Sequence, residues 1–336
     1  MKKYFLIIML ISATISKSFS QEYSFLVAGH LYGSPLSTNP VYPSKSLVSN
    51  TSFINSLQSS FFISLGDNCR NGDDTTALRI FNESFTRQIK IPIYTAYGNH
   101  DGNRSSIEKR TGRKTYFSFL KKSELFIFID SELDDNILNK ECLNFFLTIL
   151  SNAIADTSIK NVFILSHKLI WSLSDEKYKK ITDNSNDRKY RYDRYRTFYL
   201  NIKPLLDKAS NTKDIYWISG DIGQPWSLPI FYEKDNKITY LATGLGDSPM
   251  DAILDFRVSD AKVNIIAYDL ITHKSIDYKN YNLTFWSNSF RKHLVLYRRV
   301  LQILDKHFFV GFIVVLFISL LIGIFIQKSQ IRKKIY

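Results

Sequence analysis

The chain has 336 residues and a formal net charge of +13. Three lysines lie in residues 1–20 and four basic residues in 328–336, and neither segment contains an acid, so residues 21–327 carry only +6 of that charge. This modest basic excess suits an anionic substrate or a lipid surface, and it does not by itself indicate a nucleic-acid-binding protein.

The first 20 residues are typical of a secretory signal peptide. Met1-Lys2-Lys3 precedes an apolar run at residues 4–11, and Ser18-Phe19-Ser20 supplies small residues for cleavage near Ser20. About 285 residues then precede the next long apolar run, which is enough for one large domain. We therefore expect a signal peptide at residues 1–20 and a domain at residues 21–283.

Apolar periodicity predicts alternating strands and helices along this domain. Short apolar runs predict strands at residues 23–28, 63–65, 91–97, 115–119, 125–129, 162–165, 215–218, 239–242 and 263–268. The runs at 115–119 and 125–129 flank Lys121-Lys122-Ser123 and should pair. Apolar residues close to a 3.6-residue period predict helices at 75–88 and 139–154.

Polar side chains follow four of these apolar runs. They occur in Gly66-Asp67-Asn68, Gly98-Asn99-His100-Asp101, Ser166-His167 and Ser219-Gly220-Asp221. Open α/β sheets build their sites at the carboxyl ends of strands. Carboxylate, amide and imidazole groups that meet there are suitable ligands for divalent metal ions, so the sequence predicts a metal centre.

The order of these motifs resembles that of the calcineurin-like metallophosphoesterase superfamily, which has a purple-acid-phosphatase-like fold. The resemblance covers residues 23–268, and Gly98-Asn99-His100-Asp101 is its most specific motif. It implies an α/β (α+β) fold, a four-layer β-sandwich flanked by helices, with two metal ions held by loops at the strand ends.

The resemblance also implies roles for individual residues. Asp67 would bridge both metal ions, Asn99 would bind the second ion, and His167 would supply an imidazole ligand. His100 would meet the phosphate and the leaving oxygen, and Asp101 would orient it. For each of them the alternative is a turn residue, a helix cap or a core polar residue.

Two motifs depart from the family pattern. Where the family has Gly-Asp-x-His-x-Gly, the chain has Gly29-His30-Leu31-Tyr32-Gly33. Where the family has Gly-His-x-His, it has Gly220-Asp221-Ile222-Gly223. One carboxylate and one imidazole have therefore exchanged motifs, Tyr32 replaces a histidine, and Gly223 offers no side-chain ligand.

The altered motifs leave the number of metal ions open. Asp67, Asn99, His167 and Asp221 would form the second metal site. The first keeps Asp67 and His30, with the Tyr32 phenolate as a further donor that would favour a trivalent ion such as iron. We expect one or two divalent or trivalent ions of the manganese, iron, zinc or magnesium class, with one tight ion and a weak or absent second as the alternative.

The predicted chemistry is hydrolysis of a phosphomonoester or phosphodiester by metal-activated water. Bound metal ions neutralise phosphoryl oxygens and lower the pKa of bound water to about 7. Arg70 and Lys168 lie beside ligand positions and would contact the substrate phosphate, although both could equally be solvated.

A second apolar run at residues 308–326 contains no charge and is long enough to span a bilayer. Four basic residues follow it, as in a stop-transfer segment that remains in the cytoplasm; they are Lys328, Arg332, Lys333 and Lys334. We expect a transmembrane helix at 308–326 and a basic cytoplasmic tail at 327–336. A buried core helix is the alternative.

Residues 284–307 combine apolar and basic residues, which predicts a juxtamembrane amphipathic stalk that could lie on anionic lipid. A plain stalk is equally compatible with this pattern. The expected topology is a single-pass membrane protein with its N-terminal domain in the periplasm, at the cell surface or in an organelle lumen, and its C-terminus in the cytoplasm.

Two classes of function follow. The first is a membrane-anchored exported phosphoesterase that acts on a lipid-linked or envelope-associated phosphoester. The second is a protein of the same fold with weak or no catalysis, which acts as a binding or assembly factor at the cell envelope. The missing ligand at Gly223 favours the second, and Asn99-His100-Asp101 favours the first. No nucleic-acid partner is expected.

Overall fold

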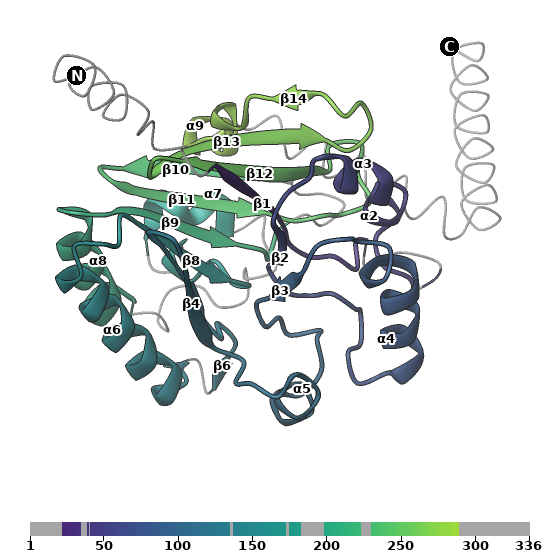
Figure 1. Ribbon diagram of the computed structural model, residues 1–336, viewed down its shortest axis with the longest axis horizontal. Coiled ribbons are helices and arrows are strands. Elements are labelled where there is room, and N and C mark those ends of the chain that lie inside the picture. The colour runs from purple at the N-terminus through teal and green to yellow at the C-terminus, as the bar shows by residue number, and fades with distance from the viewer. Residues whose placement is uncertain are drawn as a thin grey trace, which may run out of the picture.

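Two six-stranded mixed sheets pack face to face at the centre of the computed structural model (Figure 1). The structure describes residues 22–34, 39, 41–134, 137–172, 175–182, 198–222 and 230–288. In the first sheet the strand order is β14-β13-β12-β1-β2-β3. Its strands are β1 (Tyr23–Ala28), β2 (Phe61–Ser64), β3 (Ile93–Thr95), β12 (Ala252–Ser259), β13 (Lys262–Asp269) and β14 (Ser275–Ile276).

The second sheet has the order β10-β11-β9-β8-β5-β4. Its strands are β4 (Phe117–Lys121), β5 (Glu124–Phe128), β8 (Asn161–Ser166), β9 (Asp214–Ser219), β10 (Ile230–Asp235) and β11 (Ile238–Thr243). A separate two-stranded ribbon contains β6 (Leu133–Asp134) and β7 (Ile137–Leu138). Strands β1, β2 and β3 run parallel, as do β5, β8, β9 and β11, so their carboxyl ends lie at one edge of each sheet.

Aromatic side chains fill the core between the two sheets. In β1, Phe25 and Val27 face this core, whereas Leu26 and Ala28 face the opposite side, as the two-residue period of a strand requires. The ring of Phe25 packs edge-on against Phe126 from the second sheet, with the ring centroids 5.1 Å apart. Contacts of this kind fix the two sheets against each other.

Helices cover the outer face of each sheet and give four layers (Figure 1). On the first sheet lie α2 (Lys45–Val48), α3 (Thr51–Ser56), α4 (Thr75–Phe81) and the π-helical turn η1 (Asn82–Thr86). On the second lie α6 (Lys140–Ala155), the π-helical turn η5 (Phe198–Ile202) and α8 (Lys203–Ser210). The remaining helices are α5 (Arg104–Thr111), η2 (Ile170–Ser172), η3 (Glu176–Tyr178), α7 (Lys179–Thr182), η6 (Tyr278–Asn280) and α9 (Leu283–Ser287).

The predicted elements are confirmed to within a few residues. The predicted strand at 23–28 coincides with β1, and the predicted pair at 115–119 and 125–129 forms the antiparallel pair β4 and β5. The helix predicted at 75–88 is α4 continued by η1. The helix predicted at 139–154 is α6, whose N-cap Asn139 accepts hydrogen bonds from the backbone N–H groups of Glu141 and Cys142.

The boundary predicted after residue 283 is wrong in the structure. Helix α9 crosses it, and Trp286 is buried against the second sheet, where its Nε1–H donates to the carbonyl of Ile230 at 3.0 Å. The globular part therefore continues to at least Ser287. Trp286 was not recognised as a core residue because basic residues follow it closely in sequence.

The two cysteines, Cys69 and Cys142, are free and buried in different hydrophobic clusters. Within the described part of the chain, no helix is both long enough and apolar enough to cross a membrane. The predicted signal peptide, transmembrane helix, cytoplasmic tail and Gly223 lie outside the described residues, as does the stalk beyond residue 288.

Candidate metal centre

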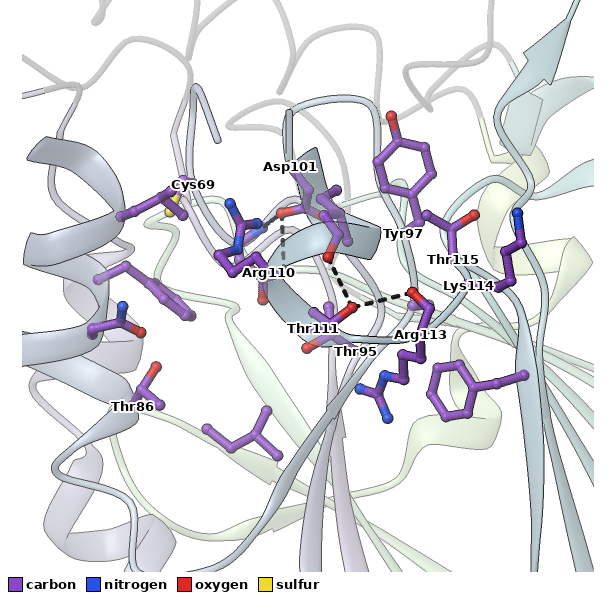
Figure 2. Close-up of a pocket in the computed structure, with 18 residues that line it drawn as sticks. Cys69, Thr86, Thr95, Tyr97, Asp101, Arg110, Thr111, Arg113, Lys114 and Thr115 are labelled. Atoms are coloured by element: carbon purple, nitrogen blue, oxygen red, sulfur yellow. Dashed lines mark hydrogen bonds between the residues drawn. The ribbon is translucent and has the colours of Figure 1, made fainter. Parts of the chain in front are cut away.

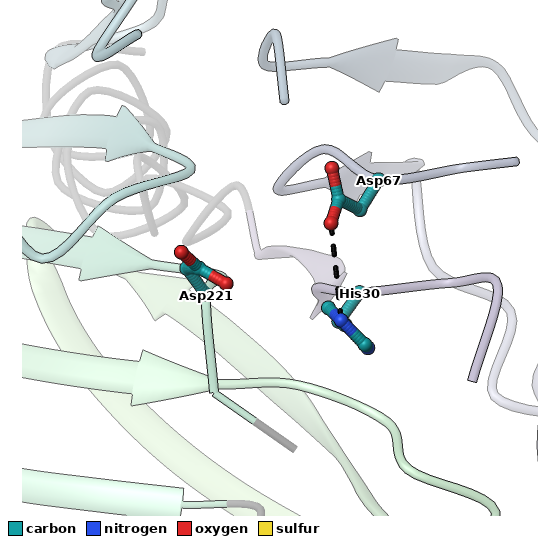
Figure 3. Close-up of side chains that lie close together, drawn as sticks. All are labelled: His30, Asp67 and Asp221. Carbon is teal, nitrogen blue, oxygen red and sulfur yellow. Dashed lines mark ion pairs between the residues drawn. The ribbon is translucent and has the colours of Figure 1, made fainter. Parts of the chain in front are cut away.

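Four buried side chains meet where strands of both sheets end. His30 and Asp67 follow β1 and β2 of the first sheet, and His167 and Asp221 follow β8 and β9 of the second. One ligand atom each from His30, Asp67 and Asp221 lies within 4.8 Å of the other two (Figure 3). The structure thus brings together His30 and Asp221, the imidazole and the carboxylate that have exchanged motifs relative to the family pattern.

Glycines allow these loops to approach so closely. A Cβ atom on Gly98 would lie 2.5 Å from the backbone nitrogen of Asp67, which is closer than any real contact. Gly66 has a φ of +87°, and a Cβ there would lie 2.9 Å from Nδ1 of His167. Asp67 itself has a φ of 56°, an uncommon conformation for a residue other than glycine.

Backbone carbonyls fix the orientation of both buried imidazoles. His30 Nδ1 lies 2.9 Å from the carbonyl oxygen of Leu245, and His167 Nδ1 lies 2.8 Å from that of Leu65. A carbonyl can only accept, so Nδ1 of each ring carries the proton and donates it. The Nε2 atoms therefore point toward the acids. His30 Nε2 is 3.8 Å from Asp67 Oδ2, and His167 Nε2 is 3.3 Å from Asp67 Oδ1 and 3.7 Å from Asp221 Oδ1.

The charges of these groups depend strongly on one another. Burial lowers the pKa of His30, so this ring is neutral. Burial would also lower the pKa of His167, but the carboxylates of Asp67 and Asp221 raise it to about 10. Burial would raise the pKa of Asp67, yet the imidazoles of His167 and His30 hold it well below its usual range. The charges of Lys168 and His167 likewise lower the pKa of Asp221 against the effect of burial, so both acids are ionised. Without a metal ion the protonated His167 ring supplies a positive charge beside them, and a bound metal ion would replace that proton on Nε2.

The donor set fits a metal ion. His30 Nε2, His167 Nε2 and Asp67 Oδ2 are buried and have no hydrogen-bond partner among the described residues, which is costly for polar atoms. Two imidazole nitrogens and two carboxylates suit zinc, iron or manganese. A cation bound between His30, Asp67 and Asp221 would satisfy the first and third of these atoms, and His167 Nε2 lies beside this group, 3.3 Å from Asp67 Oδ1 and 3.7 Å from Asp221 Oδ1. In such a site His30, Asp67, His167 and Asp221 would be the ligands.

Asp101 connects the two loops that carry Asp67 and Asn99. Its Oδ2 accepts from the backbone N–H groups of Asp67 and Gly98 at 2.9 and 3.0 Å. Its Oδ1 accepts from the backbone N–H and the side-chain amide of Asn68 at 2.7 and 3.0 Å. Burial and the neighbouring charge of Asp67 raise the pKa of Asp101 to about 6.

The orienting role expected of Asp101 belongs instead to a backbone group. The His100 ring donates from Nδ1 to the carbonyl of Arg70 at 2.8 Å, which leaves Nε2 as the atom that can accept a proton. The four donors already bound by the Asp101 carboxylate explain why it does not serve His100. His100 also donates its backbone N–H to Asp67 Oδ1 at 3.0 Å.

Asn99 and Lys168 contact each other. Asn99 is exposed, and its Oδ1 accepts from Lys168 Nζ at 3.2 Å. Lys168 is buried and also contacts Asp221 Oδ2 and Glu132 Oε1, each at 3.3 Å. The alternative of a solvated Lys168 is therefore wrong.

Tyr32 and Arg70 border the same site. The Tyr32 ring is buried, and its centroid lies 4.3 Å from that of His30 and 5.0 Å from that of His100. Burial and the charges of Asp67 and Asp221 raise the pKa of Tyr32 well above its usual range, whereas the charges of Arg70 and Lys168 oppose this shift. The Tyr32 side chain is therefore a neutral phenol beside these carboxylates.

A cavity of about 360 Å³ lies between α4 and α5 (Figure 2). Its walls include apolar side chains such as Phe81 and Phe117 and the basic residues Arg110, Arg113 and Lys114. Asp101 and Asn68 line it, but the four candidate metal ligands do not.

Sequence reasoning did not identify Glu132 or the carbonyls that orient the imidazoles. Glu132 is half-buried, with 13% of its side chain exposed, and burial raises its pKa to about 7. The signal for Glu132 was present, because it follows the end of β5 as the other site residues follow their strands. The carbonyls of Leu65, Arg70 and Leu245 have no sequence signal, since every residue has a carbonyl.

Known proteins resemble this chain in fold. A family model described as calcineurin-like phosphoesterase matches residues 46–244, a segment that contains Asp67, Asn99, His167 and Asp221 but not His30. A purple acid phosphatase from yellow lupin (Lupinus luteus) seeds has a TM-score of 0.53 and 14% sequence identity, over 77% of this chain and 53% of that chain. This chain thus spans about half the length of the lupin protein.

A dimetal phosphatase from Danio rerio has a TM-score of 0.50 and 11% identity, over 76% of this chain and 99% of that chain. At these identities the likeness concerns the fold alone. No curated protein sequence matches the chain.

Proposed function

Because the chain belongs to the calcineurin-like phosphoesterase family, we propose that it hydrolyses a phosphomonoester or a phosphodiester at a metal centre formed by His30, Asp67, His167 and Asp221. The observation that carries this proposal is the cluster of His30, Asp67 and Asp221, with His167 in contact with both acids. Three of these four buried residues have a polar atom without a hydrogen-bond partner in the described structure. A bound metal ion would neutralise phosphoryl oxygens and activate water at neutral pH.

His100 is the residue best placed to handle a proton. The Arg70 carbonyl fixes its Nδ1–H, so Nε2 holds or releases the proton that the leaving oxygen requires. The ring is half-buried beside Tyr32, and its backbone is fixed to the Asp67 carboxylate. This anchoring keeps the imidazole at the edge of the metal centre.

Positive side chains would reduce the repulsion between an anionic substrate and the site carboxylates. Arg70 is half-buried, and its charge acts on Tyr32 at the rim of the centre. Its guanidinium can bind phosphate oxygens through two N–H groups at once. We assign Arg70 to the substrate phosphate, and we assign Lys168 to the charge balance inside the centre.

We also propose that the domain is exported and held at a membrane by residues 308–326, with the C-terminus in the cytoplasm. Residues 1–20 have the pattern of a signal peptide, and an uncharged run followed by basic residues has the pattern of a stop-transfer segment. A lipid-linked or envelope-associated phosphoester is then the substrate class that such a tether favours. Cell fractionation and protease protection of the full chain test this arrangement.

A second candidate function is that of a binding factor at the envelope with little or no hydrolysis. Two observations favour it: Lys168 contacts Asn99 and Asp221, two residues that the family pattern assigns to a metal ion, and a cavity with three basic residues lies apart from the donors. A chain of this kind would bind an anionic ligand without metal-dependent turnover.

The test uses the purified full chain in detergent, depleted of metal with a chelator and then supplied separately with Mn²⁺, Zn²⁺, Fe²⁺ or Mg²⁺. Chromogenic phosphomonoesters and phosphodiesters serve as substrates. We expect hydrolysis that is absent after depletion and returns with at least one metal. A chain that binds metal but hydrolyses neither ester class under any of these conditions would contradict the enzyme and support the binding factor.

A further inference from the structure

Lys168 places a positive charge inside the candidate metal centre. Only 4% of its side chain is exposed, and its Nζ lies 3.2 Å from Asn99 Oδ1, 3.3 Å from Asp221 Oδ2 and 3.3 Å from Glu132 Oε1. A buried ammonium is stable only when oxygens surround it in this way. The three oxygens come from loops after β3, β9 and β5, so the lysine joins the two sheets.

The backbone holds this lysine in place from both sides. Its N–H donates to Ser131 Oγ at 2.8 Å, and its carbonyl accepts from the Ser166 hydroxyl at 3.0 Å. Ser131 and Ser166 are themselves buried. These hydrogen bonds fix the backbone of Lys168, so its ammonium is part of the buried structure and is not a mobile surface group.

Asn99 and Asp221 are two of the residues that the family pattern assigns to the second metal ion, and both turn an oxygen toward the ammonium. A metal ion would bind such oxygens at about 2.0–2.2 Å. An ion at that distance would lie within a few ångströms of Nζ, where two cations repel strongly. The lysine and a second metal ion bound to these same two oxygens, Asn99 Oδ1 and Asp221 Oδ2, therefore exclude each other.

The other side of the centre still suits one ion. His30 Nε2 lies 3.8 Å from Asp67 Oδ2, and His167 Nε2 lies 3.3 Å from Asp67 Oδ1 and 3.7 Å from Asp221 Oδ1, whereas the lysine contacts Asp221 through Oδ2. The two carboxylates match the charge of one divalent ion. Glu132 Oε1 lies 3.3 Å from the ammonium, and the ionised form of this carboxyl balances its charge. The Asp67 and Asp221 carboxylates then balance one divalent ion, and Glu132 balances the lysine.

We propose that the ammonium of Lys168 takes the position of the second cation, so that the centre binds a single metal ion. The proposal rests on the proposed function for the existence of a metal centre, but the number of ions can be measured without any substrate. It also explains the altered last motif, because a carboxylate at Asp221 can contact the lysine and the metal ion with different oxygens, which an imidazole cannot do.

The test is the metal content of the full chain in detergent after depletion, titration with Mn²⁺ and removal of free ion, combined with electron paramagnetic resonance of the bound Mn²⁺. We expect one equivalent and the spectrum of an isolated ion. Two equivalents with the spectrum of a spin-coupled pair would overturn the proposal. No retained ion would overturn both this proposal and the proposed function. One ion without ester hydrolysis would support this proposal and contradict the proposed function.

Variants test whether Lys168 is what limits the centre to one metal ion. Lys168→Met removes the charge at similar length, and we expect it to bind a second equivalent and to show spin coupling. Lys168→Arg keeps a cation and should remain at one. Lys213→Met is the matched control, because Lys213 is also buried but lies before β9, at the end opposite Asp221, and donates to the carbonyls of Asp156 and Ile159. A folded Lys168→Met variant that stays at one equivalent would overturn the proposal.

Discussion

His30 Nε2 lies 3.8 Å from Asp67 Oδ2, and both atoms are buried without a hydrogen-bond partner among the described residues. The Leu245 carbonyl holds the proton of His30 on Nδ1, so Nε2 is an acceptor that faces another acceptor. Two buried acceptors at this distance destabilise the fold unless a cation lies between them. This pair is therefore the clearest structural indication that the chain holds a metal ion.

Replacing His100 should impair the chemistry and spare the metal. We expect His100→Gln to keep its metal content and to lose about 10²–10⁴-fold in kcat, because the proton for the leaving oxygen is no longer supplied. The loss should be largest for esters with poor leaving groups, which a series of aryl phosphates measures. His273→Gln is the control, since His273 contacts Asn50 on a distant loop. Equal losses across the series would contradict this role.

Replacing Asp101 should lower stability and metal affinity, unlike the replacement of His100. Asn at this position has one acceptor oxygen for four donors and would turn an N–H₂ group toward backbone N–H groups. We expect Asp101→Asn to lower stability by about 1–3 kcal/mol and metal affinity by about 10–100-fold. Thermal denaturation and metal titration measure these effects. If only the dependence on leaving group changed, Asp101 would act on His100 after all.

Gly98→Ala should disturb the metal centre without removing a donor. The added Cβ would lie 2.5 Å from the Asp67 nitrogen and 2.6 Å from Asp67 Oδ1, so the Asp67 loop must shift. We expect a loss of metal affinity in an equilibrium titration. Gly112→Ala is the matched control: it strains a residue with a φ of +70° but meets nothing within 4 Å, so it should cost about 1 kcal/mol and leave metal binding unchanged. Wild-type affinity in Gly98→Ala would contradict the close approach of these loops.

Asp251 should make stability depend on pH. Its carboxylate accepts from the Gly246 N–H, beside the Leu245 carbonyl that orients His30, and burial, assisted by the charge of Asp247, raises its pKa to about 7. An unfolded aspartate has a pKa of about 3.9. Between these two pKa values the folded chain binds one more proton than the unfolded chain. The stabilisation that this proton binding provides is therefore full below pH ~4 and is lost as the pH rises through about 7.

Asp251→Asn should remove this dependence, because the amide is neutral at all of these pH values. Its stability relative to wild type should therefore rise between pH 5 and pH 8, by no more than a few kcal/mol. Chemical denaturation of the metal-depleted protein at both pH values measures the difference. A constant difference would show that Asp251 is ionised throughout the range.

The sequence predicted the strands with continuous apolar runs well, and it failed for elements whose apolar pattern is interrupted or absent. Strands such as β8 and β11 are short apolar runs because both of their faces are covered, and such runs are visible in sequence. Strand β12 was missed because Asp255 and Arg257 interrupt its apolar pattern. Helix α5 was missed because it has no buried residue and hence no apolar period.

The donors were predicted for a similar reason, since each follows an apolar strand and the order of the motifs is preserved. Their partners were not predicted, because these contacts depend on tertiary structure. The ion pair of Lys168 with Glu132 joins loops 36 residues apart, and neither residue has a local pattern that indicates the other. The carbonyl that orients His30 lies more than 200 residues further along the chain.

The most direct measurement is the metal content of the purified full chain and of its Asp67→Ala variant, with Asp207→Ala on the exposed face of α8 as the control. Asp67 contacts both imidazoles, so its loss should abolish metal retention, while wild type and the control each retain a stoichiometric ion. A folded Asp67→Ala variant that retains as much metal as wild type would contradict the account.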